Sequence, residues 1–127
     1  MSGFNSIQVK FNQTHFKSPF ANTRQVPFDQ SYLNIIKQHI SNVTTEYFWL
    51  FADFVDMDSV DLDYIPEQHE RDQIHCWYDN SDVVNSREGN IFLIPTRAFK
   101  QQMSQLSFLR EYNHVNYHPA KITQSPY

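Results

Sequence analysis

The residues best suited to chemistry follow a run of aromatic and aliphatic side chains. The stretch YFWLFADFVDMDSVDLDYIP, residues 47–66, starts as a buried strand would and then places five aspartates within eleven positions: Asp53, Asp56, Asp58, Asp61 and Asp63. Carboxylate oxygens are the ligands that hard divalent cations prefer, and such a cation can hold a phosphate group. We therefore take Asp53, Asp56 and Asp58 as candidate metal ligands. The alternative is a solvated loop whose aspartates close turns.

A second candidate site surrounds the next apolar run, IHCWY at residues 74–78. His75 and Cys76 are adjacent, so on a strand they point to opposite faces and cannot bind one metal ion together. The ring of Trp77 offers an apolar face on which a sugar could stack. We take Trp77, His75 and Asp63 as candidate ligand-binding residues, and no residue as catalytic. The alternative places His75 on a polar face and the tryptophans in the core, and we expect His114 and His118 at the surface.

Composition excludes several classes of function. The 127 residues carry a net charge of -4, and the ten basic residues are scattered, so we expect no nucleic-acid partner. The two glycines are too few for a phosphate-binding loop. No stretch approaches the ~20 apolar residues of a membrane span. The N-terminus does not resemble a signal peptide, so we expect a protein that is not secreted.

Apolar periodicity predicts alternating strands and helices. We expect a half-buried strand at 7–11, an edge strand at 24–28, a helix over 30–42 with Asp29 as its N-cap, and a buried strand at 46–54. A strand, a helix and a strand in succession predict a βαβ crossover with parallel strands. Strands at 74–78, 91–94 and 115–117, and a helix capped by Thr96 and ending near residue 105, complete the set.

These elements predict one α/β domain over 1–127, a small partly parallel sheet with flanking helices. Residues 1–6 are expected to be mobile and 118–127 to form a tail. Tyr112 and Tyr117 are expected to be exposed and to suit an interface.

The order of the segments resembles a domain found in large proteins of tailed phages, notably those of cyanobacteria, that is related to GT-A glycosyltransferases. The similarity covers roughly residues 24–106 and is carried by Thr45 to Trp49, Asp53 to Asp58, Asp63-Tyr64, Pro66, Arg71-Asp72, Ile74 to Trp77, and Gly89 to Pro95. The resemblance implies a reduced GT-A, Rossmann-like sheet. It also implies, in active members, an Asp-x-Asp at a strand end that holds Mn or Mg against the diphosphate of a nucleotide sugar.

This chain departs from that pattern, because Ala52-Asp53-Phe54 stands at the Asp-x-Asp position and Asp56 with Asp58 comes two residues later. We therefore expect a phage glycosyltransferase-like domain with lost or reduced catalysis and no cofactor, acting as a binding or scaffolding module. Its partner would be another protein, a second copy of the chain, a glycan or a nucleotide sugar, in the host cytoplasm or the virion. The alternatives are an active metal-dependent glycosyltransferase fragment and a virion structural or assembly protein.

Overall fold

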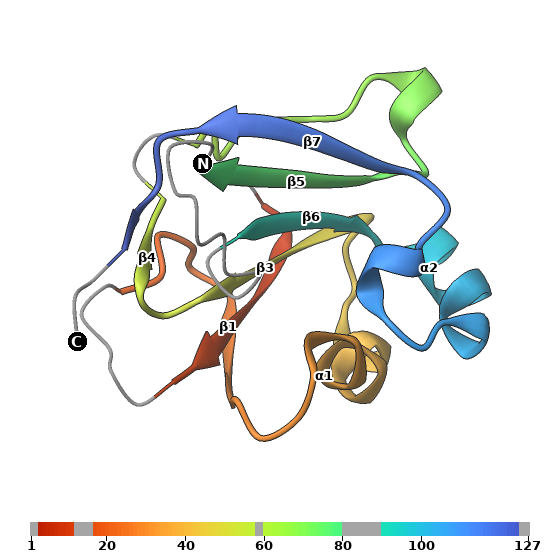
Figure 1. The fold of residues 1–127 in the computed structure, drawn as a ribbon, viewed down its shortest axis with the longest axis horizontal. Helices are drawn as coiled ribbons and strands as arrows, with labels where there is room; N and C mark the ends of the chain where they lie inside the picture. The colour runs from red at the N-terminus through yellow and green to blue at the C-terminus, as the bar shows by residue number, and fades with distance from the viewer. Residues whose placement is uncertain (1–2, 12–16, 58–59, 80–89, 125–127) are drawn as a thin grey trace.

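The computed structural model describes residues 3–11, 17–57, 60–79 and 90–124 (Figure 1). Their strands and α-helices follow in the order β1 (Asn5–Lys10), β2 (Thr23–Pro27), α1 (Tyr32–His39), β3 (Tyr47–Ala52), β4 (Val55–Asp56), β5 (Ile74–Asp79), β6 (Ile91–Pro95), α2 (Thr96–Gln102), β7 (Val115–Ala120) and β8 (Thr123–Gln124). Short 3-10 turns lie at Ile40–Asn42 (η1), Gln68–Glu70 (η2), Met103–Gln105 (η4) and Leu109–Glu111 (η5).

Six strands form one sheet in the order β2-β1-β3-β6-β5-β7, while β4 pairs with β8 in a separate ribbon. β1 is parallel to β2 and to β3, and β5 is parallel to β7. β6 is antiparallel to both of its neighbours, so it alone runs against the other five strands of the sheet. The predicted α/β class with a partly parallel sheet is confirmed, and the arrangement is compatible with a small Rossmann-like domain.

The predicted crossover is also confirmed. The chain leaves β2, passes through α1 and returns as β3, which runs in the same direction with β1 between the two strands. β2 lies at the edge of the sheet, as Pro27 predicted, because a proline cannot donate to a neighbouring strand. The carboxyl ends of β1 and β3 therefore meet side by side near Phe11 and Asp53.

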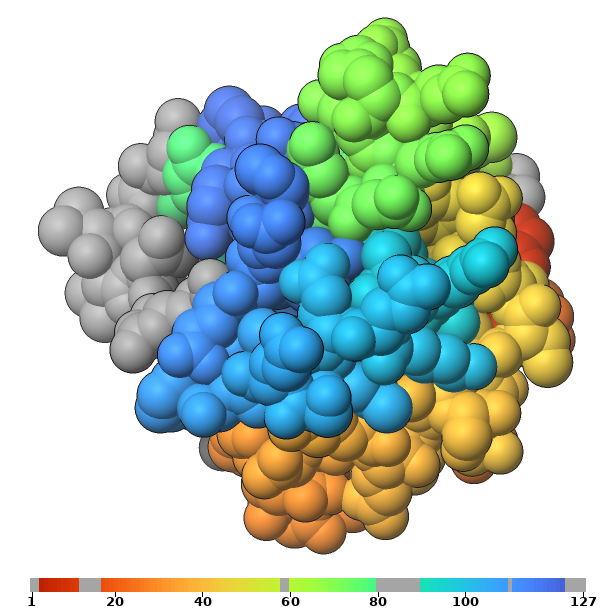
Figure 2. Space-filling view, turned by 90° about the vertical axis from the view of Figure 1, so that its right-hand side faces the viewer, coloured from red at the N-terminus to blue at the C-terminus, as the bar shows by residue number. Residues whose placement is uncertain are grey.

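The two faces of the sheet are covered differently. Both helices pack on one face, where Ile36 of α1 and Phe99 of α2 join the core formed with Phe48 and Leu50 of β3, and Figure 2 shows the two helical segments adjoining on the surface. The opposite face carries Trp49 and is covered by non-helical segments through Phe20, Val60 and Ile122. All six residues of β3 are buried, which explains its unbroken apolar run.

β1 differs from its predicted half-buried pattern, because both of its faces are covered. Gln8, which the half-buried alternation places on a solvent face, is 1% exposed, and Ser6, expected in the mobile N-terminal end, is 2% exposed. Ser6 Oγ lies 2.8 Å from Thr23 Oγ1, and Gln25 Nε2 donates to Gln8 Oε1 at 3.1 Å. Hydrogen bonds to the neighbouring edge strand thus compensate for the burial of these polar groups.

The helices begin at different caps from those predicted. Ser31, not Asp29, is the N-cap of α1, and its hydroxyl accepts a hydrogen bond from the Asn34 N–H at 3.2 Å. Pro95, not Thr96, is the N-cap of α2 and makes no side-chain cap hydrogen bond. Thr96 is the first helical residue, and its N–H donates to the Glu46 carbonyl at 3.0 Å. The predicted helix ends at 42 and 105 are reached through the 3-10 turns η1 and η4.

Three further predictions about the ends and the surface were wrong. Asn5 and Ser6 belong to β1 rather than to a mobile end, and residues 118–120 belong to β7 rather than to a tail. Tyr112 is buried at 4% exposure, because its ring stacks on Phe99 with centroids 5.6 Å apart. Tyr117, at 60%, is exposed as expected.

Candidate functional site

Asp53, the first predicted metal ligand, lies where the carboxyl ends of β1 and β3 meet. Its side chain is fully buried, and both carboxylate oxygens lie 3.2 Å from the Phe11 N–H that donates to them. Its own N–H donates to the Val9 carbonyl at 2.9 Å. The residue therefore joins the ends of two parallel strands. Open α/β sheets bind ligands at this edge, and here the carboxylate is bonded to backbone.

The other aspartates of the acidic loop lie in different surroundings. Asp56 is partly buried in β4 and pairs with Thr123 of β8. Asp58 lies outside the described residues. Asp63 is exposed, and its N–H donates to the Asp61 carboxylate at 3.0 Å, so Asp61 closes a turn as the alternative interpretation expects. Metal binding by Asp53, Asp56 and Asp58 stays a prediction.

His75 and Trp77, the predicted ligand-binding residues of β5, belong to a cluster on the sheet face that carries no helix. Two positions apart, they share one face of the strand. The parallel register sets His118 of β7 beside Trp77, and the two rings stack with centroids 4.8 Å apart. Tyr64, from the chain before η2, packs its ring edge-on against Trp77 at 5.2 Å. We call His75, His118, Tyr64 and Trp77 the histidine cluster.

Hydrogen bonds fix the tautomers within the histidine cluster. His75 Nε2 lies 3.2 Å from the carbonyl oxygen of Glu70, which can only accept, so Nε2 carries the proton. The neutral ring then presents an acceptor at Nδ1, and His118 Nε2 donates to it at 3.0 Å. The Tyr64 hydroxyl also reaches His75 Nδ1, at 3.4 Å. Burial lowers the pKa of both histidines, which favours their neutral forms.

Sequence reasoning missed two members of the histidine cluster, His118 and Tyr64. His118 was expected at the surface but is partly buried against His75, whereas His114 is exposed as expected. The predicted strand at 115–117 was the signal that could have placed His118. Extending that strand by one residue puts His118 on the same face as Asn116. Nothing in the sequence fixed the pairing of that strand with β5. Asp63, the third predicted residue, is exposed next to Tyr64.

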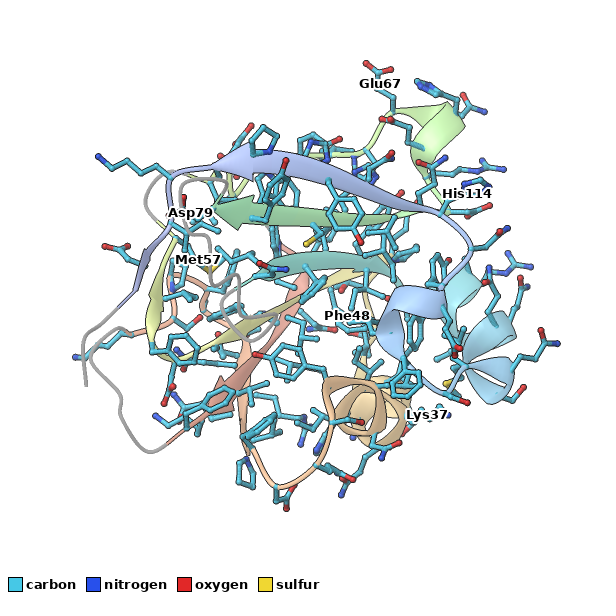
Figure 3. The ribbon with its side chains drawn as sticks, viewed as in Figure 1. Lys37, Phe48, Met57, Glu67, Asp79 and His114 are labelled. Carbon is cyan, nitrogen blue, oxygen red and sulfur yellow. The ribbon has the colours of Figure 1, made fainter. Side chains whose placement is uncertain are left out.

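Three side chains of types that can bind metals lie in η2 and at its N-cap. The ligand atoms of Glu67, His69 and Glu70 all lie within 4.8 Å of one another. Glu67 and His69 are exposed, and Figure 3 shows Glu67 pointing outward from the lobe that carries η2. Exposed acidic groups often gather without binding an ion, so this cluster alone identifies no site.

A pocket of about 470 Å³ opens on the other face of the sheet. Its floor is formed by β5, β6 and β7, and its walls by the start of α1 and the chain around Phe108. Of the described residues that line it, none carries a charge: Phe28, Ser31, Tyr32, Leu33, Ile74, Cys76, Asn90, Phe92, Ser107, Phe108, Leu109, Val115 and Tyr117. We call this the aromatic pocket.

Exposed rings surround the aromatic pocket. Phe28 is 40% exposed, Phe108 52% and Tyr117 60%, and they lie on three separate segments of the chain. Exposed aromatic side chains that converge on one concavity are typical of binding sites. Cys76 is buried in the floor as predicted, and burial raises the pKa of its thiol to about 12, so it is not a reactive thiolate.

Comparison of the chain with protein families, with curated proteins and with solved structures gave no match. No helix in the described part of the chain is long and apolar enough to cross a membrane.

Proposed function

We propose that the protein is a phage glycosyltransferase-like domain that has lost catalysis and acts as a binding module, with the aromatic pocket as its binding site. The observation that carries this proposal is the ring-lined pocket, whose described lining residues are uncharged and include three exposed aromatic side chains. Its volume lies within the roughly 300–1,000 Å³ of ligand sites in proteins.

The surroundings of Asp53 support the loss of catalysis. A carboxylate that holds a cation against a diphosphate must face the ligand. Asp53 is fully buried, and its oxygens accept the Phe11 N–H. The strand-end aspartate thus has a structural task at the position where the active relatives implied by the resemblance bind metal.

The lining of the aromatic pocket indicates the kind of ligand. A diphosphate needs cationic side chains or a bound cation, and the described part of the pocket lining includes neither lysine nor arginine. Sugar rings instead present apolar faces that stack on aromatic rings and hydroxyls that bond to neutral polar groups. Phe108 and Tyr117 supply such rings, and Ser31, Asn90 and Ser107 supply such polar groups. A neutral sugar residue of a glycan is therefore the ligand that we propose.

The test is thermal unfolding of the purified protein with methyl glycosides of common neutral sugars, and separately with a nucleotide sugar plus Mn²⁺. A ligand that binds only the folded state raises the melting temperature. We expect a rise with at least one neutral glycoside, and we expect Phe108→Ala to abolish it. Ile65→Ala is the matched control, since Ile65 is 71% exposed and lies outside the pocket.

Two results would contradict the proposal. A rise that occurs only with nucleotide sugar and Mn²⁺, and that Asp56→Asn removes, would indicate the active enzyme instead. If no glycoside has an effect and Phe108→Ala converts a dimer into a monomer in sedimentation, the pocket is a contact between copies of the chain.

A further inference from the structure

We propose that His75, His118 and Tyr64 form a site for a divalent transition-metal ion of the zinc class. The ligands are His75 Nδ1, His118 Nε2 and Tyr64 Oη. This site lies on the opposite face of the sheet from the aromatic pocket and does not depend on glycan binding.

Two of the three distances between the proposed ligand atoms are already close to the required spacing. A tetrahedral zinc ion with Zn–N bonds of about 2.05 Å separates its ligand atoms by about 3.3 Å. His75 Nδ1 lies 3.0 Å from His118 Nε2 and 3.4 Å from Tyr64 Oη. An ion therefore fits after shifts of a few tenths of an ångström, which side-chain rotation can supply.

The orientation of the two imidazoles also fits metal binding. Their planes differ by 18° and their centroids are 5.2 Å apart, while the facing nitrogens are at 3.0 Å. The rings thus meet edge to edge in nearly one plane, with ring nitrogens directed at each other. Ring nitrogens bind metals along in-plane directions, and an ion bound to both rings would lie to one side of the line between the two nitrogens, so binding would turn each ring toward it.

A hydrogen bond to the backbone orients the His75 ring, as is common for histidines that bind metals. A ligating histidine usually donates its other N–H to a carboxylate or a backbone carbonyl, which fixes the tautomer and the ring orientation. His75 Nε2 meets the Glu70 carbonyl at 3.2 Å, and its ring is fully buried. Trp77 stacks on His118 and limits its rotation. The site is therefore preorganised from two sides.

The ligand set indicates which ion would bind. Imidazole suits Zn²⁺, Cu²⁺ and Ni²⁺, whereas Mg²⁺ and Ca²⁺ prefer carboxylates and carbonyls. Binding requires the proton on His118 Nε2 to leave and Nδ1 of the same ring to take one up, so this ring keeps its charge. Tyr64 releases one proton if it binds as phenolate. A fourth position is left for water or another ligand, reached past the partly exposed His118 ring.

The test starts from protein that has been treated with a chelator and is then titrated with Co²⁺. The visible spectrum of Co²⁺ distinguishes four- or five-coordinate sites from octahedral ones. We expect one equivalent to give the intense bands of a four- or five-coordinate site, and Zn²⁺ to displace it. His118→Gln should weaken Co²⁺ binding at least a hundredfold, and Tyr64→Phe should change the spectrum. His114→Gln and His69→Gln are matched controls that should change neither.

Circular dichroism in the near ultraviolet establishes that each variant is folded, and Tyr64→Phe tests the site without removing a histidine. Two outcomes would overturn the proposal. Weak octahedral Co²⁺ binding that only His69→Gln removes would assign the ion to the exposed cluster on η2. No binding to wild type at millimolar Co²⁺ would leave His75 and His118 as a hydrogen-bonded pair. Neither outcome affects the glycoside test, which depends on Phe108.

Discussion

Asp53 provides the sharpest test of whether the end of β3 is structural or functional. Replacing it with alanine removes the acceptor of the Phe11 N–H, since both carboxylate oxygens lie 3.2 Å from that nitrogen. An unpaired buried donor costs about 1–3 kcal/mol, and the lost side chain leaves a small void worth roughly 1 kcal/mol more. Asp53→Ala should therefore lower the free energy of unfolding by about 2–4 kcal/mol.

Asparagine has nearly the shape of aspartate and keeps one acceptor oxygen. Asp53→Asn should therefore cost only about 1 kcal/mol, the difference between a charged and a neutral acceptor. Urea unfolding can follow both variants through the fluorescence of Trp49 and Trp77, which are buried at 0% and 7% exposure. Asp29→Ala is the matched control, because Asp29 is exposed and does not cap α1, and its effect should stay within about 0.5 kcal/mol.

The sign of the Asp53→Asn effect discriminates between the two roles. A buried carboxylate kept for metal binding carries an uncompensated charge in the metal-free protein, so neutralising it would stabilise the fold. A gain in stability for Asp53→Asn without metal, or a loss that appears only when Mn²⁺ is present, would refute the structural role.

The remaining predictions concern stability. Burial raises the pKa values of Tyr47 and Tyr112 from the ordinary 10.0 to about 12. Both tyrosines therefore contribute their full stabilisation of the folded state below pH 10, and this stabilisation is lost between pH 10 and 12. Tyr112→Phe removes the hydrogen bond to the Asp72 carbonyl at 2.7 Å and should cost about 1 kcal/mol at neutral pH, and urea midpoints should show the gap from wild type closing by pH 12. A gap that stays constant with pH would contradict this reasoning. Ser31→Ala should cost about 1 kcal/mol through loss of the α1 cap, with exposed Ser104→Ala near zero in the same denaturation assay. Lys37 Nζ donates to the Leu106 carbonyl at 3.1 Å and joins α1 to the chain after α2 (Figure 3), so Lys37→Met should cost about 1 kcal/mol by urea unfolding, whereas exposed Lys100→Met should cost almost nothing.

The predictions that succeeded depended on local patterns. The apolar run at 47–52 identified a strand buried on both faces, and Pro27, which cannot donate to a neighbouring strand, identified an edge strand. The cap of α1 was not fixed by the local pattern, because Asp29, Gln30 and Ser31 all precede the helix and only the backbone geometry selects one of them. Ser31 rather than Asp29 has its hydroxyl next to the Asn34 N–H.

Residues far apart in the sequence were harder to place. Gln8 was expected to be exposed, because its alternation with Ile7 and Val9 carries no sign of the segments that cover the second face of the sheet. The loop aspartates looked equivalent in the sequence, yet Asp53 is fully buried while Asp63 is exposed. Asp53 is buried because it lies next to the end of β1, where it bonds to the Phe11 N–H. The sequence around the aspartates does not show which of them will meet β1.

The sequence by itself determined the six strands of the main sheet, the two α-helices and the burial of β3, because these properties depend on short-range periodicity, but it did not indicate β4 or β8. Only the tertiary structure decided that β6 runs antiparallel, that Asp53 joins β1 to β3, and that His118 meets His75, which lies 43 positions earlier in the sequence. Those outcomes depend on strand order and register, which are set by the packing of the whole core.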